Sequence, residues 1–228
     1  MIYVKTIARY FHFFYYTASN WNIALAFFVL YHDIRGASRY GIRRSFAPVS
    51  LANLTITDAD ITRSSPYEAV SFYMLEKLLN ALRTFSRATD IVDLGCGKGR
   101  VLAVAAHHGF NRIVGIDFAK ELCEEAERNM QKVQRHFPGV GYEIIHSNVL
   151  CYHIQPTDSV FFLFNPFDAG TLVQFLQMLH QSLLLYPRDT WFIYASPQHI
   201  EVLIRAGYKQ VFETQMMNLK GKIFFKQA

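Results

Sequence analysis

Residues 90–108 read DIVDLGCGKGRVLAVAAHH and combine a short apolar run, three closely spaced glycines and a helical segment. The glycines stand at alternate positions, as Gly95, Gly97 and Gly99. Because glycine carries no Cβ, such a turn bends sharply and brings its backbone close to a ligand. The helix that follows offers free N–H groups and the positive end of its dipole. The stretch therefore predicts a strand, a ligand-binding turn and a helix in succession.

Two common nucleotide-binding patterns do not fit this turn. The dinucleotide pattern G-x-G-x-x-G would need a third glycine where Arg100 stands. The phosphate-binding pattern G-x-x-x-x-G-K-[ST] is absent. What remains is D-x-G-x-G-x-G, with Asp93 two residues before the first glycine.

From Asp90 onward, short apolar runs alternate with longer segments of helical period, which is typical of a parallel sheet covered by helices on both faces. The last two runs lie too close together for a helical crossover, so we expect an antiparallel hairpin with Gly221 in its turn. The predicted fold is α/β and Rossmann-like, with a seven-stranded, mostly parallel sheet and a helical N-terminal extension. The runs are residues 90–94, 112–116, 142–146, 159–164, 190–195, 208–214 and 222–226.

The glycine turn, the seven runs and the terminal hairpin resemble the class I S-adenosylmethionine-dependent methyltransferases, over roughly residues 66–228. The resemblance is nearest to small bacterial members of unassigned substrate, which carry a DLGCGKGR turn and an NPF motif with one proline. It implies S-adenosylmethionine as the cofactor, with the backbone of Gly95, Cys96, Gly97 and Gly99 against its methionine end. Asp93 is implied to order the turn or to meet the cofactor's ammonium group through water.

Two further strand ends carry residues suited to a nucleoside. Asp117 lies 22 residues after Gly95, close to the spacing at which an acid binds ribose hydroxyls, and a carboxylate can accept from both hydroxyls. Phe118 beside it belongs to the predicted cofactor site. The resemblance implies that Asn148 and Val149, after the third run, contact the adenine amino group and ring. The alternative is that Asp117 only caps the following helix.

The fourth run ends in Asn165-Pro166-Phe167, our candidate catalytic residues. In the family's amino-group methyltransferases, a related motif with two prolines accepts hydrogen bonds from a planar amino group and stacks an aromatic ring on it. This chain has one proline where that motif has two. The alternative is that Asn165 and Pro166 merely end a strand and that Asp168 caps the next helix.

These residues predict a methyltransferase acting on an amino or amide nitrogen of a protein or small molecule. The alternatives are a nucleic-acid N-methyltransferase and a non-catalytic S-adenosylmethionine-binding partner subunit. Residues 88–228 hold 13 basic and 13 acidic residues, and this neutral balance counts against a nucleic-acid acceptor. The histidines lack zinc-ligand spacing, so we expect no metal site.

The chain divides into an N-terminal extension with a basic linker, residues 1–65, and a methyltransferase domain, residues 66–228. Residues 1–87 hold 10 basic and 5 acidic residues and thus the whole net charge of +5. Residues 10–31 contain no charged side chain, but polar residues such as Asn20 interrupt them. We therefore favour aromatic-rich helices packed on the domain. Contact of residues 10–35 with a membrane surface and a spanning anchor are the alternatives.

Residues 36–66 predict a surface connector, because they collect Gly, Ser, Thr, Asp and Pro without long periodicity. Helical pattern resumes after Ser65-Pro66. The resemblance implies that this helix start covers the cofactor, with Tyr67 as a candidate lid residue. The three cysteines show neither disulfide nor metal spacing and favour a reducing, cytoplasmic location.

Overall fold

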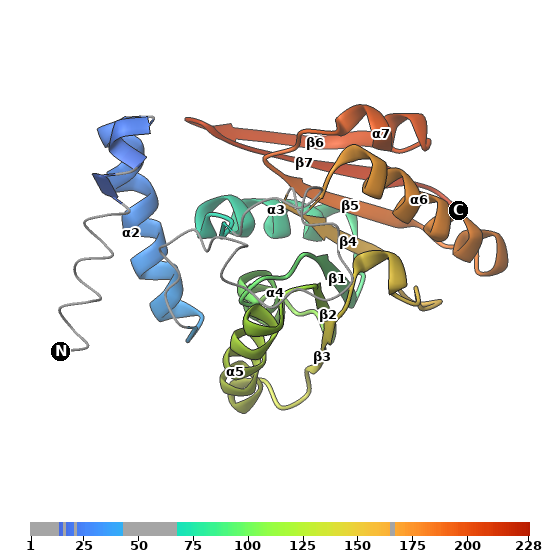
Figure 1. The fold of residues 1–228 in the computed structure, drawn as a ribbon, viewed down its shortest axis with the longest axis horizontal. Coiled ribbons are helices and arrows are strands. Elements are labelled where there is room, and N and C mark those ends of the chain that lie inside the picture. The colour runs from blue at the N-terminus through green and yellow to red at the C-terminus, as the bar shows by residue number, and fades with distance from the viewer. Residues whose placement is uncertain (1–13, 16, 21, 43–67, 165–166) are drawn as a thin grey trace.

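The computed structural model describes residues 14–15, 17–20, 22–42, 68–164 and 167–228 (Figure 1). Its central feature is a seven-stranded sheet in the order β3-β2-β1-β4-β5-β7-β6. Strands β1 to β5 are parallel, and β7 pairs antiparallel with both β5 and β6. This confirms the predicted α/β fold with its C-terminal hairpin. The strands are β1 (Asp90–Leu94), β2 (Arg112–Asp117), β3 (Gly141–His146), β4 (Val160–Leu163), β5 (Thr190–Ala195), β6 (Lys209–Met216) and β7 (Leu219–Lys226).

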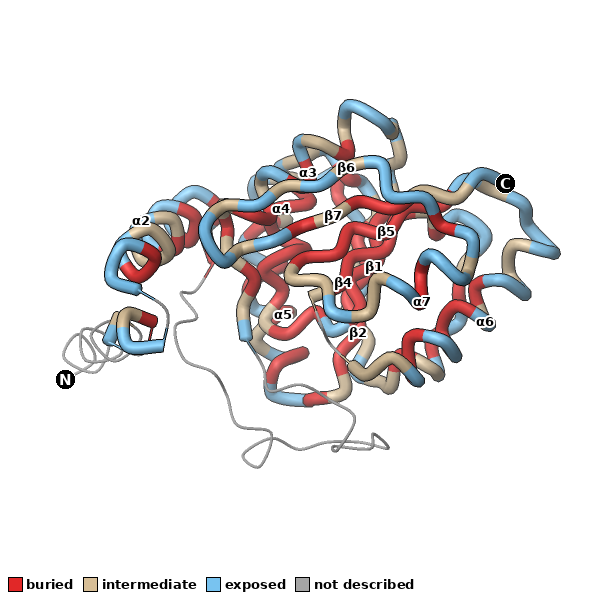
Figure 2. Tube along the Cα trace, turned by 90° about the horizontal axis from the view of Figure 1, so that it is seen from above, coloured by how far each residue is buried: buried red, intermediate tan, exposed pale blue. Residues whose placement is uncertain are grey.

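Helices cover both faces of the sheet, and the central strands β1, β2, β4 and β5 are almost wholly buried (Figure 2). Successive side chains of a strand point to opposite faces, so Ile91 joins one core and Val92 the other. On the first face lie α3 (Phe72–Phe85), α4 (Arg100–His107) and α5 (Lys120–His136). On the second lie α6 (Ala169–Leu185), α7 (Ile200–Arg205) and the short 3-10 helix η3 (Val149–Cys151).

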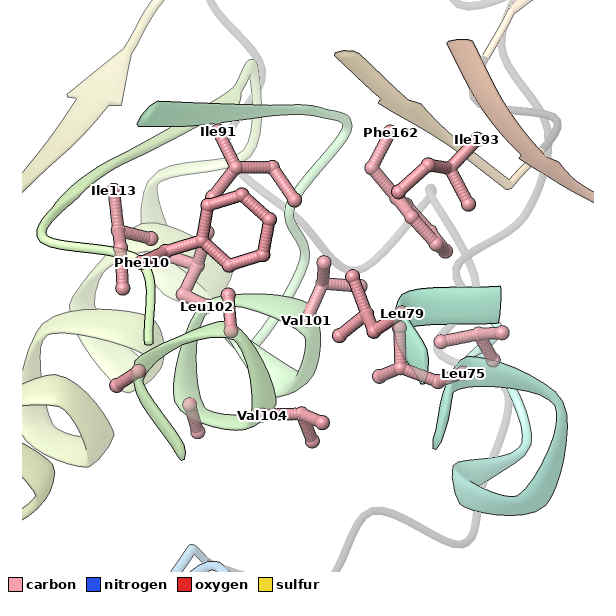
Figure 3. Packing of buried hydrophobic residues seen from close by; sticks show 14 of the residues in the cluster. Leu75, Leu79, Ile91, Val101, Leu102, Val104, Phe110, Ile113, Phe162 and Ile193 are labelled. Atoms are coloured by element: carbon pink, nitrogen blue, oxygen red, sulfur yellow. The ribbon is translucent and has the colours of Figure 1, made fainter. Parts of the chain in front are cut away.

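The first core joins helices α3 and α4 to the middle of the sheet. Leu75 and Leu79 of α3 point toward Val101 of α4, near Phe162 of β4 and Ile193 of β5 (Figure 3). Both leucines are fully buried. The apolar stripe predicted for α3 is therefore the stripe that contacts the sheet, and it fixes the position of the helix that follows the glycine turn.

The C-terminal hairpin differs from the prediction in its turn. Residues 217–218 connect the strands, and Met217 adopts the left-handed region with φ 52°. Gly221 instead lies inside β7, opposite Ala195 of β5. The physical reason is close packing: a Cβ at Gly221 would lie 2.7 Å from Met74 Sδ and 2.9 Å from Leu78 Cδ1 of α3. The placement of Gly221 in the turn was wrong.

Helix α2 (Ile23–Arg39) confirms a helical N-terminal region but runs further than expected. Asn22 caps its start by accepting a hydrogen bond from the Leu25 N–H at 2.7 Å. Residues 36–39 belong to the helix, so the predicted connector does not begin there. Gly36 packs against the ring of Phe72, where a Cβ would overlap it, which explains a glycine inside this helix.

The start of α3 also differs from the prediction. Residues 68–70 are not helical, and α3 begins only at Phe72. The Val70 carbonyl accepts a hydrogen bond of 2.7 Å from the Arg100 side chain, which holds this stretch outside a helix. Ser65, Pro66 and the candidate lid residue Tyr67 lie outside the described residues.

The outer face of α2 is apolar. Ile23, Phe27 and Tyr31 recur at four-residue steps and are each more than 60% exposed. Within the described part of the chain, no helix combines the length and the apolarity needed to cross a membrane. Contact of residues 10–35 with a membrane surface stays an untested alternative to the favoured packing on the domain.

We expect Gly221→Ala to lower the free energy of unfolding by about 1–3 kcal/mol, because the added methyl group overpacks the contact with α3. Gly139→Ala is the matched control, since nothing lies within 4 Å of a Cβ there. Both substitutions reduce the entropy of the unfolded chain alike. Urea unfolding of both variants measures the difference, and equal stabilities would contradict the assigned packing.

Candidate functional site

The glycine turn connects β1 to α4 at the carboxyl edge of the parallel strands. Gly95, Gly97 and Gly99 all have positive φ, at 87°, 52° and 76°, a region that other residues rarely adopt. The N–H groups of Gly95 and Cys96 both donate to the Ile116 carbonyl at 2.9 Å. The turn is therefore bonded directly to the end of β2.

Asp117 joins this turn to the start of α5. Its Oδ2 accepts from the Gly97 N–H at 2.8 Å, and its Oδ1 accepts from the Ala119 N–H at 2.9 Å. The side chain is buried, which raises the pKa of the carboxyl, while the hydrogen bonds from Ala119 and Gly97 oppose that shift. The sequence-based expectation that Asp117 and the glycine turn meet at one end of the sheet is confirmed.

Asp93 of β1 lies at the same end of the sheet as Asp117, but its environment is different. It is 2% exposed, and its Oδ2 has no hydrogen-bond partner in the part of the chain that the structure describes. Burial raises the pKa of this carboxyl well above its ordinary value, and the nearby Asp117 raises it further. A buried polar atom without a partner costs free energy. The ammonium group of S-adenosylmethionine, a hydrogen-bond donor of opposite charge, is the kind of group that would remove this cost.

Asn148 and Val149 stand at the carboxyl end of β3, at the same edge. The Asn148 Oδ1 accepts from the Leu150 N–H at 2.9 Å and caps η3. Val149 is buried in the second core. Phe118 is half-buried, and its carbonyl lies 3.1 Å from the His146 Nε2. These residues lie at the ends of neighbouring strands, as predicted, and their contacts with adenine stay a prediction.

The predicted catalytic motif is described only in part. Asn165 and Pro166 lie outside the described residues. Phe167 is half-buried and packs against the second core. Asp168 caps α6, because its Oδ1 accepts from the Thr171 N–H at 2.8 Å. The alternative interpretation included a cap by Asp168, and that part is confirmed. The role of Asn165 stays a prediction.

Two supports of the turn were missed by the sequence analysis. Asn129 of α5 is 1% exposed and donates to the Lys98 carbonyl at 2.9 Å. Arg100, the first residue of α4, forms an ion pair of 2.7 Å with Asp33 of α2. Two features of the sequence could have indicated these contacts. Asn129 is an amide on the apolar face of a predicted helix, and Asp33 is the only Asp or Glu before Asp58.

A separate pocket of about 520 Å³ opens beside β3, with Arg112, Tyr152 and His153 in its lining. Arg112 is already paired with Asp158 and lies 3.5 Å from Asp90. None of the predicted cofactor residues lines this pocket. Within the described residues, no group of three or more His, Cys, Asp or Glu side chains is placed to hold a metal ion.

Residues 91–183 match the model of a family described as a methyltransferase domain. The fold is similar to magnesium protoporphyrin IX methyltransferase from Synechocystis PCC 6803 with bound S-adenosylmethionine, at 14% identity, a TM-score of 0.51 and coverage of 67% of this chain and 77% of that one. It is also similar to an RNA methyltransferase from Salinibacter ruber in complex with S-adenosylhomocysteine. Here the identity is 16%, the TM-score is 0.53, and the match covers 70% of this chain and 94% of that one.

A third similar structure is an S-adenosylmethionine-dependent methyltransferase from Aquifex aeolicus. The identity is 15%, the TM-score is 0.50, and the match covers 69% of this chain and 93% of that one. At these identities the likeness establishes the fold. No curated protein sequence matches the chain. A methyltransferase-domain model thus matches residues 91–183, within a fold that the chain shares with S-adenosylmethionine-dependent methyltransferases.

We expect Asp93→Asn to weaken S-adenosylhomocysteine binding about tenfold, through loss of a charge-assisted hydrogen bond. Calorimetric titration measures this affinity. The same variant tests the raised pKa of Asp93. Because the folded state holds the Asp93 proton more tightly than the unfolded chain, this group makes folding less favourable as pH rises above its unfolded pKa.

The stability of Asp93→Asn relative to the parent should therefore increase from about pH 4 to about pH 7. Urea unfolding of the ligand-free proteins across this range measures the trend. A pH-independent difference, together with unchanged affinity, would show that Asp93 is an ordinary structural residue.

Proposed function

We propose that this methyltransferase transfers the methyl group of S-adenosylmethionine to an amino or amide nitrogen of a protein or a small molecule. The observation that carries the proposal is the adjacency of β1 and β4. The two strands pair with Leu94 opposite Leu163. One strand leads into the glycine turn and the other into Asn165-Pro166-Phe167, so the donor site and the acceptor motif follow neighbouring strand ends.

The sheet topology favours a ligand at this position. Strand order reverses between β1 and β4, and the crevice outside such a reversal is where open α/β sheets bind ligands. In the proposal, the turn at Gly95, Cys96, Gly97 and Gly99 lies against the methionine end of the cofactor, and Asp93 faces its ammonium group. Asp117 accepts from the ribose.

The remaining proposed contacts are with the adenine and the acceptor. Phe118, Asn148 and Val149 bound the adenine. Asn165 accepts a hydrogen bond from the acceptor nitrogen, and the ring of Phe167 stacks on its planar group. The packing of Phe167 against the second core supports a fixed ring orientation.

When bound, S-adenosylmethionine supplies a methyl group on a positively charged sulfur. Transfer would replace the C–S bond by an N–C bond made with the nitrogen lone pair, and the electron pair of the C–S bond would stay on sulfur. The nitrogen then releases one proton to water. The residues named above contribute orientation and exclusion of water, the main requirements of an in-line displacement.

A nucleic-acid acceptor is the second candidate, since exocyclic amines suit the same motif. The balanced charge of residues 88–228 counts against it. The proposal therefore ranks proteins and small molecules first.

The cofactor class is tested by titrating the full-length protein with S-adenosylhomocysteine and with NAD in separate calorimetric experiments. We expect binding of the first compound only, because Arg100 occupies the third glycine position of the dinucleotide pattern. Asp117→Asn should weaken S-adenosylhomocysteine binding about tenfold, since a neutral amide accepts hydrogen bonds from the ribose hydroxyls less strongly than a carboxylate does. Binding of NAD alone would end the proposal.

The acceptor class is tested by incubating the protein and radiolabelled S-adenosylmethionine with separated protein, nucleic-acid and small-molecule fractions of cells. We expect label in the protein or small-molecule fraction. Asn165→Ala should reduce this transfer at least tenfold with little change in S-adenosylhomocysteine affinity. The exposed residue Asn218 supplies the control substitution, Asn218→Ala. Label confined to nucleic acid would identify the second candidate, and cofactor binding without transfer would indicate a non-catalytic subunit.

A further inference from the structure

We propose that Asp33 of α2 is a positioning residue for the cofactor turn and acts through Arg100. The inference rests on the proposed function, because the turn is taken as the binding site of S-adenosylmethionine. It assigns a role in cofactor binding to the N-terminal helix, which lies at one end of the molecule and outside the residues that match the methyltransferase family (Figure 1).

Arg100 connects three parts of the chain. Its Nη1 lies 2.7 Å from the Asp33 Oδ1, and the two side chains are only 8% and 7% exposed. The same nitrogen donates to the Val70 carbonyl at 2.7 Å. The guanidinium carbon also lies 4.1 Å from the centre of the Phe72 ring, a cation–π contact. Arg100 thus ties α2 and the start of α3 to the first residue of α4.

The position of Arg100 in the chain makes this link relevant to the cofactor. Gly99, with φ 76°, directly precedes it and caps α4. The other side of the turn is already fixed, since the Gly97 N–H donates to Asp117 and the Lys98 carbonyl accepts from Asn129. The Asp33 contact fixes the remaining side, where α4 begins directly after the turn that lies against the methionine end of the cofactor in the proposed complex.

A buried ion pair is weak evidence for stability, because the cost of removing two charges from water offsets their attraction. Removal of one partner is a different matter, since the other charge is then left buried and unpaired. Without Asp33, the guanidinium would move toward water, and the backbone that it shares with the glycine turn would move with it. The expected consequence is a loss of order in the turn.

A separate cluster of polar contacts, between the α2 region and α3, supplies a matched control. Glu76 of α3 accepts from Tyr40 Oη at 2.7 Å and from Arg39 Nη1 at 3.4 Å, and it lies 3.7 Å from Arg35 Nη1. None of these contacts involves Arg100 or the glycine turn. Glu76→Gln therefore weakens the attachment of α2 without touching the link from Asp33 to the turn.

The test compares Asp33→Asn and Glu76→Gln in the full-length protein by calorimetric titration with S-adenosylhomocysteine, well below either melting temperature. We expect about five- to tenfold weaker binding for Asp33→Asn and less than about a twofold change for Glu76→Gln. Asp33→Glu, which keeps the charge, should recover part of the loss. Equal affinities of Asp33→Asn and the parent would overturn the inference, as would equal losses in the two variants.

The double variant Asp33→Leu/Arg100→Met addresses the case in which Asp33→Asn does not fold. An apolar pair of similar volume commonly replaces a buried ion pair without loss of stability. We expect it to fold and still to bind S-adenosylhomocysteine at least about fivefold more weakly than the parent. Parent-like affinity in this folded double variant would show that the ion pair does not position the turn.

Amide hydrogen exchange separates this inference from the proposed function. In the ligand-free proteins, Asp33→Asn should reduce the protection of amides in residues 95–103 relative to Glu76→Gln. This readout does not depend on the cofactor. If the parent binds no S-adenosylhomocysteine, the proposed function fails, whereas unchanged protection in Asp33→Asn would overturn the positioning role alone.

Discussion

The two hydrogen bonds accepted by the Asp117 carboxylate determine how the rest of the site is arranged. They hold the Gly97 N–H of the turn and the Ala119 N–H at the start of α5 around one buried side chain. Burial disfavours the charge and raises the pKa of Asp117, and the two N–H donors offset part of that cost. A carboxylate held in this way fixes the glycine turn relative to the start of α5, so a ligand bound here would meet a preformed surface.

Strand order explains why the site forms where it does. The parallel strands β3, β2, β1, β4 and β5 all end at one edge, and the order reverses between β1 and β4. Asp93, Asp117 and Asn148 therefore converge although more than 50 residues separate the first from the last. Among the residues that the structure describes, the buried Asp93 Oδ2 has no hydrogen-bond partner, and this is destabilising. Such a cost is typical of a group whose partner is a ligand.

Much of the fold was predictable because it follows from local patterns. Apolar runs located all seven strands, and the glycines located the turn that meets the end of β2. The adjacency of Gly97 and Asp117 followed from parallel strands alone. The assignment failed where a distant contact decides local structure. Gly221 resembles a turn residue in sequence, but helix α3 packs where a side chain at this position would lie. The start of α3 was misplaced because Arg100, some thirty residues away, binds the Val70 carbonyl.

Contacts between distant parts of the chain also explain why the sequence analysis missed two residues beside the glycine turn. Asn129 and Asp33 stabilise the turn through side chains that approach it only after helices α5 and α2 have packed. No periodicity or spacing in the sequence records such a contact. The extent of α2 was underestimated because Gly36 resembles a helix end, although it lies against Phe72.

The most direct measurement is a crystal structure of the full-length protein with S-adenosylhomocysteine. The central claim predicts the ribose hydroxyls within hydrogen-bond distance of the Asp117 carboxylate and the ammonium group at Asp93, directly or through one water. A nucleoside bound elsewhere on the molecule, with the space between Gly97 and β4 filled by packed side chains, would contradict it.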